Sequence, residues 1–181
     1  MSALITDRYR DQQAQMHADV EHPYGVASAQ FAASVAKVID QYGVDELLDY
    51  GSGSRLTLIN TIAEQRIVKR KFAYRAYDPA VEMYSATPEP TEMVACLDVL
   101  EHIEPLCLDS VLDDLKRVTK KIGFFTVSTV AAAKKLPDGR NAHLIIEPAE
   151  WWLPQITARF KLQSFQRMSN GFIVLVSPAE P

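Results

Sequence analysis

A short glycine-containing loop follows an apolar run in the first third of the chain. Leu47-Leu48-Asp49-Tyr50-Gly51-Ser52-Gly53 places an acidic residue and two glycines directly after a segment typical of a buried strand. Glycine takes positive φ readily and has no Cβ, so backbone N–H groups of such a loop can approach a ligand closely at the start of the next helix. The pattern favours a nucleoside site, with a plain turn as the alternative. The residues expected at the ligand are Asp49, Tyr50, Gly51, Ser52 and Gly53.

The glycine spacing separates two classes of ligand. A dinucleotide fingerprint has a third glycine three residues after the second, because its helix must face a pyrophosphate closely. Leu56 stands at that position, which disfavours a nicotinamide-dependent oxidoreductase. S-adenosylmethionine contains no pyrophosphate, so the acidic-x-Gly-x-Gly core suffices for it.

A second carboxylate follows the next predicted strand. Residues 72–77 alternate apolar and polar side chains and end at Asp78-Pro79, about one strand-helix-strand unit beyond the glycine loop. Nucleoside-binding α/β folds place at this point the acid that accepts the ribose hydroxyls. Asp-Pro also starts turns, which is the structural alternative. The position of Asp78, together with the glycine loop, favours the ribose role.

The order of the motifs resembles that of a known family. After the glycine loop and Tyr77-Asp78-Pro79, the chain continues with Asp98-Val99-Leu100-Glu101-His102-Ile103 and a helix-strand pair over 112–128. This set, covering about residues 44 to 128, is similar to the class I S-adenosylmethionine-dependent methyltransferases. Residues 136–144 and Glu150-Trp151-Trp152 are similar to small methyltransferases often carried by bacteriophages, which suggests a phage origin.

The resemblance implies that the protein binds a cofactor and transfers a methyl group from it to an acceptor. The cofactor is S-adenosylmethionine, and its binding residues would include the glycine loop, Asp78, Pro79, Asp98, Val99 and, closing over it, Tyr24. The expected catalytic residues are His143, first candidate for a base in the loop after Gly139-Arg140-Asn141, then Asp98 and His102. For each histidine, capping or loop packing is the structural alternative, and Asp98 could simply cap its turn.

Two departures from the family pattern affect cofactor binding. Arg55 replaces a usual glycine, where it could crowd the methionine end of the cofactor or pair with its carboxylate. The interval from Asp78 to Val94 is too short for a full helix and a third strand, so Glu92 is only a guess for the adenine contact. These departures support the alternative of a non-catalytic binding or assembly protein on a degenerate methyltransferase fold.

Several features disfavour duplex DNA as the methyl acceptor and leave a nucleotide, a small metabolite or a peptide open. The leading hypothesis is methylation of an oxygen or nitrogen atom of a small molecule or nucleotide. The Asn/Asp-Pro-Pro-aromatic tetrad of exocyclic-amine DNA methyltransferases is replaced by residues 97–100, Leu-Asp-Val-Leu, and no Pro-Cys pair occurs. The net charge of −4 also makes duplex DNA an improbable partner. The basic residues Lys134, Lys135 and Arg140 could attract an anionic substrate.

Periodicity predicts an α/β architecture with a mostly parallel sheet and an antiparallel terminal hairpin. The resemblance to the methyltransferases implies a Rossmann-like methyltransferase fold, here shortened around its third strand. The terminal hairpin is signalled by Asn170-Gly171. Expected helices cover 6–21, 28–42, 56–65, 108–120 and 148–159; expected strands cover 46–49, 72–77, 93–97, 123–128, 161–167 and 172–176. In Trp151-Trp152 only one ring can face the core, so the other should line a pocket or an interface.

Length and composition bound the remaining expectations. With 181 residues, 48% of them apolar, the chain should form one domain, with N-terminal helices over 1–42 and an α/β core over 44–181. The sequence has neither a signal peptide pattern nor a membrane span, which favours a cytoplasmic protein. Cys96 and Cys107 are expected to be reduced, and their spacing suggests no metal site. A homodimer could complete the pocket, because little chain remains for a lid.

Overall fold

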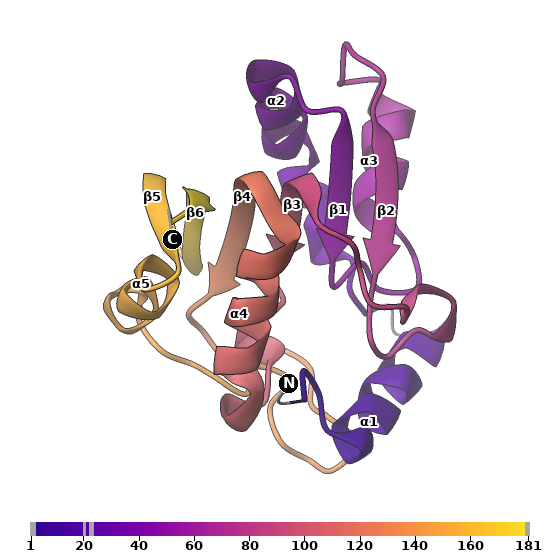
Figure 1. Cartoon of the computed structure of the whole chain (residues 1–181). Helices are drawn as coiled ribbons and strands as arrows, with labels where there is room; N and C mark the ends of the chain where they lie inside the picture. The colour runs from indigo at the N-terminus through magenta and orange to yellow at the C-terminus, as the bar shows by residue number, and fades with distance from the viewer. Residues whose placement is uncertain (1–2, 20, 22–23, 180–181) are drawn as a thin grey trace.

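The computed structural model describes residues 3–19, 21 and 24–179 and is built on a six-stranded sheet with the order β2-β1-β3-β4-β6-β5 (Figure 1). The first four strands of this order are parallel, β6 is antiparallel to β4, and β5 is antiparallel to β6. The predicted α/β class and terminal hairpin are therefore confirmed. The strands are β1 (Glu46–Tyr50), β2 (Ala73–Tyr77), β3 (Thr91–Leu97), β4 (Thr119–Ser128), β5 (Phe160–Met168) and β6 (Gly171–Pro178).

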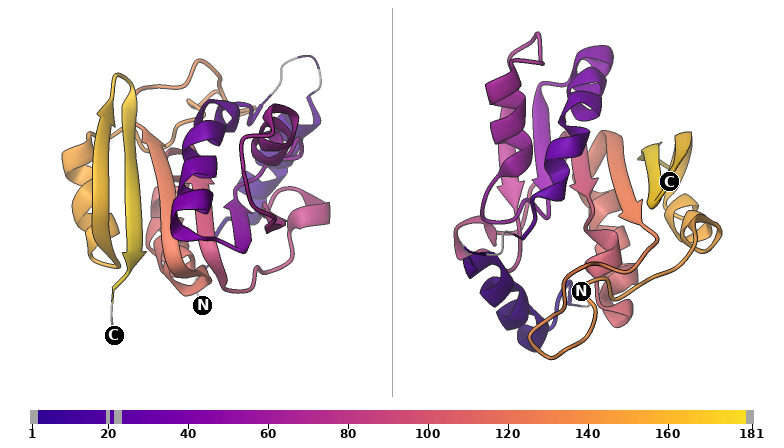
Figure 2. Two further views of the ribbon diagram at one scale, coloured as in Figure 1. Left: turned by 90° about the horizontal axis from the view of Figure 1, so that it is seen from above. Right: turned by 180° about the vertical axis from the view of Figure 1, so that it is seen from behind.

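Helices cover both faces of this sheet (Figure 2). Strand residues alternate between the faces, as the pleat requires. Leu48 and Val94 pack on the side of α4 and α5, whereas Leu47 and Met93 pack on the side of α2 and α3. Each side chain of these four is at most 1% exposed, so both faces are core. The helices are α1 (Asp7–Ala18), α2 (Ala32–Tyr42), α3 (Thr57–Gln65), α4 (Leu108–Val118) and α5 (Ala149–Thr157).

Most differences from the predicted elements lie at their ends. The helix expected over 28–42 consists of a 3-10 helix, η1 (Ala27–Phe31), followed by α2. The helix expected over 6–21 is α1, which ends at Ala18; position 20 lies outside the described residues. Strand β4 begins four residues earlier than expected, because Thr119 pairs with Thr91 and its hydroxyl donates to the Leu115 carbonyl, ending α4.

The connection between β2 and β3 is short, as the sequence predicted. Residues 78–90 contain one 3-10 turn, η2 (Glu82–Tyr84), and no strand. Strand β2 therefore forms the edge of the sheet. The guess that Glu92 contacts adenine is wrong, because Glu92 lies at the amino end of β3, away from the strand ends that bind ligands, and its carboxylate accepts from the Asp45 N–H at 2.7 Å.

Two segments lie over the carboxyl ends of β1, β3 and β4. Figure 1 shows α1 and the long connection between β4 and α5 below these strand ends, and the reverse view in Figure 2 agrees. Helix α1 is held there by Glu104, whose carboxylate accepts from both the backbone N–H and the hydroxyl of Thr6, each at 2.9 Å. The space between these segments and the strand ends is the region that the sequence motifs predict for the ligand.

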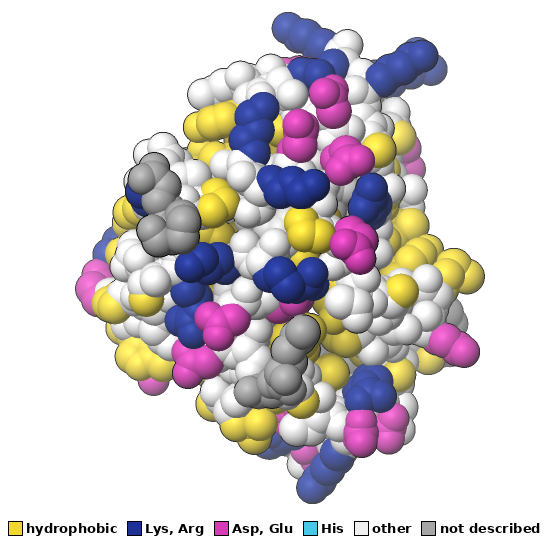
Figure 3. Space-filling model, viewed as in Figure 1, with side chains coloured by type: hydrophobic (Ala, Val, Ile, Leu, Met, Phe, Trp, Pro, Cys, Tyr) yellow, Lys and Arg dark blue, Asp and Glu magenta, His cyan; other side chains and the backbone are white. Residues whose placement is uncertain are grey.

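One of the two tryptophans and both cysteines are buried. Trp152 is fully buried and Trp151 is 40% exposed, so the two rings divide between core and surface. Cys96 and Cys107 are buried and free. Basic and acidic side chains are intermixed over the face shown in Figure 3. In the described part of the chain, none of the helices has the length and apolar character that crossing a bilayer requires.

Candidate functional site

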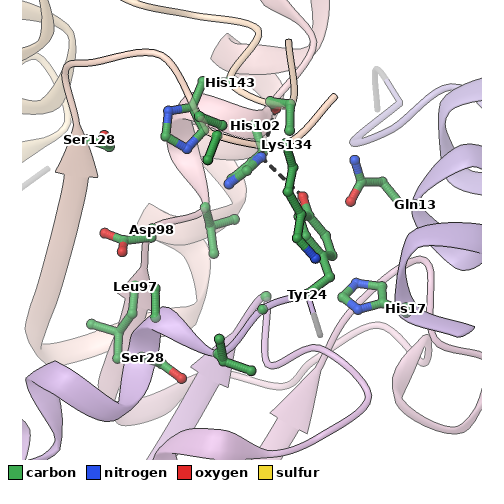
Figure 4. A pocket seen from close by; sticks show the side chains of 18 of the residues that line it. Gln13, His17, Tyr24, Ser28, Leu97, Asp98, His102, Ser128, Lys134 and His143 are labelled. Carbon is green, nitrogen blue, oxygen red and sulfur yellow. Dashed lines mark hydrogen bonds between the residues drawn. The ribbon is translucent and has the colours of Figure 1, made fainter. Parts of the chain in front are cut away.

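A cavity of about 410 Å³ lies at the carboxyl ends of β1 and β3 (Figure 4). It is also lined by α1, by residues 24–28 and by the connection after β4. A cavity of this size is within the range that binds small molecules and cofactors. Among the residues that line it are seven of the predicted site residues, namely Tyr24, Gly51, Asp78, Asp98, Val99, His102 and His143.

The glycine loop is held to the end of β2 by its own N–H groups. The N–H groups of Gly51 and Ser52 donate to the Tyr77 carbonyl at 2.7 and 3.1 Å. The Gly53 N–H donates to the Asp78 carboxylate at 3.0 Å. These three donors are therefore used within the chain, contrary to the expectation that they approach a ligand. Gly51 has room only for a glycine, since a Cβ at this position would lie 2.4 Å from the Val99 side chain. The φ angle of Gly51, +81°, also favours glycine.

Asp78 is oriented by backbone groups and keeps acceptor capacity toward the cavity. One carboxylate oxygen accepts from the Ala80 N–H at 2.9 Å and the other from the Gly53 N–H. An ionised carboxylate has about four acceptor sites, so roughly two remain. His17 of α1, which sequence reasoning missed, places Nε2 3.6 Å from the same carboxylate. Burial lowers the pKa of His17, and the charge of Asp78 opposes this shift.

The other predicted cofactor residues lie outside the main cavity. Asp49 is 2% exposed and accepts a hydrogen bond from the Tyr74 hydroxyl at 2.8 Å; burial raises its pKa to about 7. The Tyr50 hydroxyl donates to Asp114 at 3.0 Å, on the α4 side of the sheet. A neighbouring cavity of about 70 Å³ is lined by Tyr50 and Pro79, and Gly51 and Asp78 line it too. Ser52 and Gly53 are buried in the loop.

Asp98 occupies a strained position at the end of β3. Its φ is +53°, a left-handed conformation that is uncommon for residues other than glycine. The hydroxyl of Thr126 accepts from the Asp98 N–H at 2.8 Å and donates to its carboxylate at 2.7 Å, which holds the turn. Burial raises the pKa of the Asp98 carboxyl. Such conformations persist where the surrounding structure enforces them, frequently at functional sites.

His102 and His143 lie side by side at the other end of the cavity, with their ring centroids 4.7 Å apart (Figure 4). His102 Nδ1 is 2.7 Å from the Ala142 carbonyl oxygen, and His143 Nδ1 is 2.6 Å from the Val130 carbonyl oxygen. The Tyr24 hydroxyl is 3.1 Å from His102 Nδ1. Burial lowers the pKa of His102 to about 4, so this ring is neutral near pH 7.

Glu101 lies next to these histidines, with one carboxylate oxygen within 4.8 Å of a ring nitrogen of each. The sequence did not predict it as a site residue. Its side chain is fully buried, and one carboxylate oxygen accepts from the Ser128 N–H at 2.8 Å. The other oxygen, Oε2, has no hydrogen-bond partner among the residues that the structure describes. Burial raises the pKa of this carboxyl well above its usual range. The sequence feature that could have indicated a site here is the Glu101-His102 pair shortly after β3. The neighbouring His143 is 41 residues beyond His102, so the sequence could not show that the three side chains lie together.

The basic residues divide between the cavity and the surface. Lys134 lines the cavity, with Nζ 5.7 Å from the centre of the Tyr24 ring. Lys135 is exposed, and Arg140 pairs with Asp138 at 2.8 Å outside this cavity. Arg55 is exposed and does not line the cavity, so it does not crowd the space where a cofactor would lie.

Comparison with solved structures shows the same architecture in methyltransferases. One is the 1,6-didemethyltoxoflavin-N1-methyltransferase of Burkholderia thailandensis, crystallised with 1,6-didemethyltoxoflavin and S-adenosylhomocysteine. It aligns with a TM-score of 0.62 at 15% identity over 99% of this chain and 92% of that chain. The chain has the fold of the class I methyltransferases. This confirms, at the level of the fold, the resemblance that the sequence motifs suggested.

Other methyltransferase structures share this fold at similarly low identity. A SAM-dependent methyltransferase from Aquifex aeolicus aligns with a TM-score of 0.56 at 16% identity, covering 90% of this chain and 97% of that chain. The mitomycin 7-O-methyltransferase MmcR aligns with a TM-score of 0.58 at 12% identity over 84% of this chain, which spans 54% of MmcR. The chain thus spans about half the length of some methyltransferases that it matches. No protein-family profile and no curated protein sequence matches the chain.

Proposed function

We propose that this protein is an S-adenosylmethionine-dependent methyltransferase that acts on an oxygen or nitrogen atom of a small molecule or nucleotide. The observation that carries the proposal is the cavity at the strand ends, which brings together Gly51, Asp78 and Asp98 with His102 and His143. Solved structures with the same fold support it, since one holds S-adenosylhomocysteine and a small-molecule substrate.

The residues of the cavity suit the cofactor. Asp78 has free acceptor sites for the two ribose hydroxyls, and its carboxylate is fixed by two backbone N–H groups. Gly51 leaves room beside Val99, where a side chain at position 51 would collide. Bound there, the cofactor would supply a methyl group made electrophilic by its sulfonium. The protein must then align an acceptor with that methyl group, and alignment alone contributes roughly 7 to 11 kcal/mol of barrier lowering.

The acceptor is expected at the end of the cavity that holds the histidines. His102 and His143 each have Nδ1 beside a carbonyl oxygen, which leaves Nε2 as the nitrogen that can accept a proton or bind an electrophile. Asp98 lines the same cavity, where its carboxylate can orient the acceptor (Figure 4). Lys134 adds a basic group that favours an anionic acceptor.

Isothermal titration of the full chain with S-adenosylmethionine and S-adenosylhomocysteine tests the proposal, with NAD⁺ as the control ligand. We expect heat with the first two ligands and none with NAD⁺. The absence of heat at millimolar S-adenosylhomocysteine would overturn the proposal. Binding without transfer of a labelled methyl group to any fraction of a cell extract would instead favour the non-catalytic alternative.

Some sequence predictions accompany this proposal. A phage origin, a cytoplasmic location, a homodimer, the lack of duplex-DNA binding and the one-domain organisation stay predictions. The exposure of Arg55, together with its position outside the lining of the cavity, supports a site with room for the cofactor.

A further inference from the structure

Three potential metal ligands converge beside the end of the cavity that would hold the acceptor, and two of them, His102 and His143, line it. Glu101 and His102 are adjacent in η3 (Leu100–His102), directly after β3, and His143 comes from the connection after β4. One ligand atom from each of the three lies within 4.8 Å of the others. The fold itself maintains this arrangement, because the Glu101 carbonyl accepts from the N–H groups of Leu144 and Ile145 at 2.8 and 3.0 Å.

The hydrogen bonds of the two histidines select one tautomer. A carbonyl oxygen can only accept, so the contacts of 2.7 Å to Ala142 and 2.6 Å to Val130 place an N–H on Nδ1 of each ring, whatever its charge. In the neutral form of a ring this is its single N–H. Nε2 then carries a lone pair in both rings. Histidines that bind metals are typically oriented in this way, with the other ring nitrogen donating to a backbone carbonyl or a carboxylate.

Glu101 supplies an independent indication that a cation belongs here. Its Oε2 atom is buried and has no hydrogen-bond partner among the described residues, while Oε1 is held by the Ser128 N–H. Buried carboxylates are almost always paired or bound to metals, because their burial is otherwise costly. Asp98 adds a second acidic group near Glu101, which increases the negative charge that a cation would offset.

We propose that Glu101, His102 and His143 bind one divalent first-row transition-metal ion. Two imidazoles and one carboxylate form known sites for Zn²⁺ and for Fe²⁺ that leave coordination positions open for a substrate or water. This inference departs from the expectation of no metal site, which considered only the spacing of the cysteines. It uses residues from two segments that only the folded chain brings together.

The role of the ion rests on the proposed function and names a class of acceptor, a hydroxyl group that binds the metal through oxygen. The ion makes this hydroxyl more acidic, and its proton leaves to solvent water. The oxygen lone pair forms the bond to the methyl carbon, the S–CH₃ bond breaks, and its electron pair stays on sulfur as the thioether. The oxidation state of the metal does not change. Nε2 of both histidines is then a ligand, and neither ring acts as a base.

Titration with Co²⁺ and Zn²⁺ of the full chain, after dialysis against a chelator, tests the metal site directly. Calorimetry gives the stoichiometry, and the visible absorption of Co²⁺ reports coordination by nitrogen and oxygen. We expect one ion per chain.

Two variants test the ligands. Glu101→Gln keeps an acceptor for the Ser128 N–H, and His143→Ala changes a half-buried side chain, so both variants should fold. Circular dichroism checks the folding. Each should weaken binding by at least about tenfold.

His17→Gln is the matched control, because it removes an imidazole that lines the same cavity but lies outside the group of three. Its metal affinity should equal that of the unmodified protein. Absence of Co²⁺ binding would overturn the site. So would a Co²⁺ affinity of Glu101→Gln and His143→Ala equal to that of the unmodified protein. Titration of the same samples with S-adenosylhomocysteine separates the two proposals: cofactor binding without Co²⁺ binding overturns only the metal site, and Co²⁺ binding without cofactor binding overturns only the methyl transfer.

Discussion

Asp78 is the residue on which cofactor recognition depends most directly. Asp78→Asn should weaken S-adenosylhomocysteine binding by about tenfold or more, since hydrogen bonds to a charged group contribute roughly 1.5–3 kcal/mol each. The amide keeps one oxygen to accept from Gly53 or Ala80, which limits the damage to the loop. Titration calorimetry measures the change. The control is Asp40→Asn, because the Asp40 carboxylate accepts from the Lys69 N–H and does not line the cavity. An unchanged affinity would remove Asp78 from the site.

Gly51 should tolerate no side chain, because it combines a positive φ with a close neighbour. We expect Gly51→Ala to lower the free energy of unfolding by about 2 kcal/mol or more, from backbone strain and from contact with Val99. Gly139→Ala is a matched control, since its φ is +88° and an added Cβ would meet nothing within 4 Å. Urea unfolding of both variants separates strain from collision. Equal losses would mean that Val99 yields without cost.

Residues at strand ends were the part of the site that the sequence could predict. Gly51, Asp78 and Asp98 each follow a predicted strand, and parallel strands bring their carboxyl ends to one edge. His17 and Glu101 escaped prediction for a different reason. His17 reaches the cavity only because α1 docks there, and Glu101 reads as a polar turn residue until its burial is seen.

At the scale of elements, the connection between β4 and α5 positions His143, and Asn141 organises it. The Asn141 side chain accepts from the Ala132 N–H at 3.0 Å and donates to the Ala132 carbonyl at 2.9 Å. Its oxygen also accepts from the His143 N–H at 2.9 Å. Asn141→Ala should speed hydrogen exchange at the amides of Ala132 and His143 by about fivefold or more, as expected from the loss of roughly 1 kcal/mol per hydrogen bond.

The control for this element is Asn60→Ala. Asn60 is exposed in α3, and its side-chain amide donates to the Arg55 carbonyl at 2.9 Å. Exchange in the connection should be unaffected by this variant. If Asn141→Ala also left the exchange of Ala132 and His143 unchanged, the connection would be held by other contacts and Asn141 would have no positioning role.

Periodicity located the elements well but not the connection that completes the site. Amphipathic spacing predicted α2, α3 and α4, because each helix packs one face on the core. Apolar runs predicted β1 and β3, because both faces of these strands are buried. Residues 129–148 carry no such periodicity. Their path is fixed by long-range contacts, such as those of Leu144 and Ile145 to the Glu101 carbonyl.

For the whole molecule, the buried Asp49 predicts a specific pH dependence of stability. Its pKa is about 7 when folded and near 3.9 when unfolded, so the folded chain binds more protons between these values. The stability that Asp49 contributes is therefore present below about pH 4 and is lost as the pH rises to about 7. Relative to Asp49→Asn, the free energy of unfolding should fall over this range by at most about 4 kcal/mol.

Urea unfolding of the protein and of Asp49→Asn from pH 4 to pH 8 measures this difference. The Tyr74 hydroxyl can still donate to the asparagine oxygen, so the hydrogen bond is retained. His102 has the opposite effect, with stability lost as the pH falls from about 6.5 to about 4, but both proteins contain it and the comparison cancels it. A constant difference across the range would contradict the assigned ionisation of Asp49.

The most direct test of the central claim is a crystal structure of the full chain with S-adenosylhomocysteine. We predict ligand density in the cavity at the ends of β1 and β3, with both ribose hydroxyls donating to Asp78 and the sulfur directed toward the end that holds His102 and His143. An empty cavity at saturating ligand, or ligand bound elsewhere on the chain, would contradict the proposed function and leave only the fold.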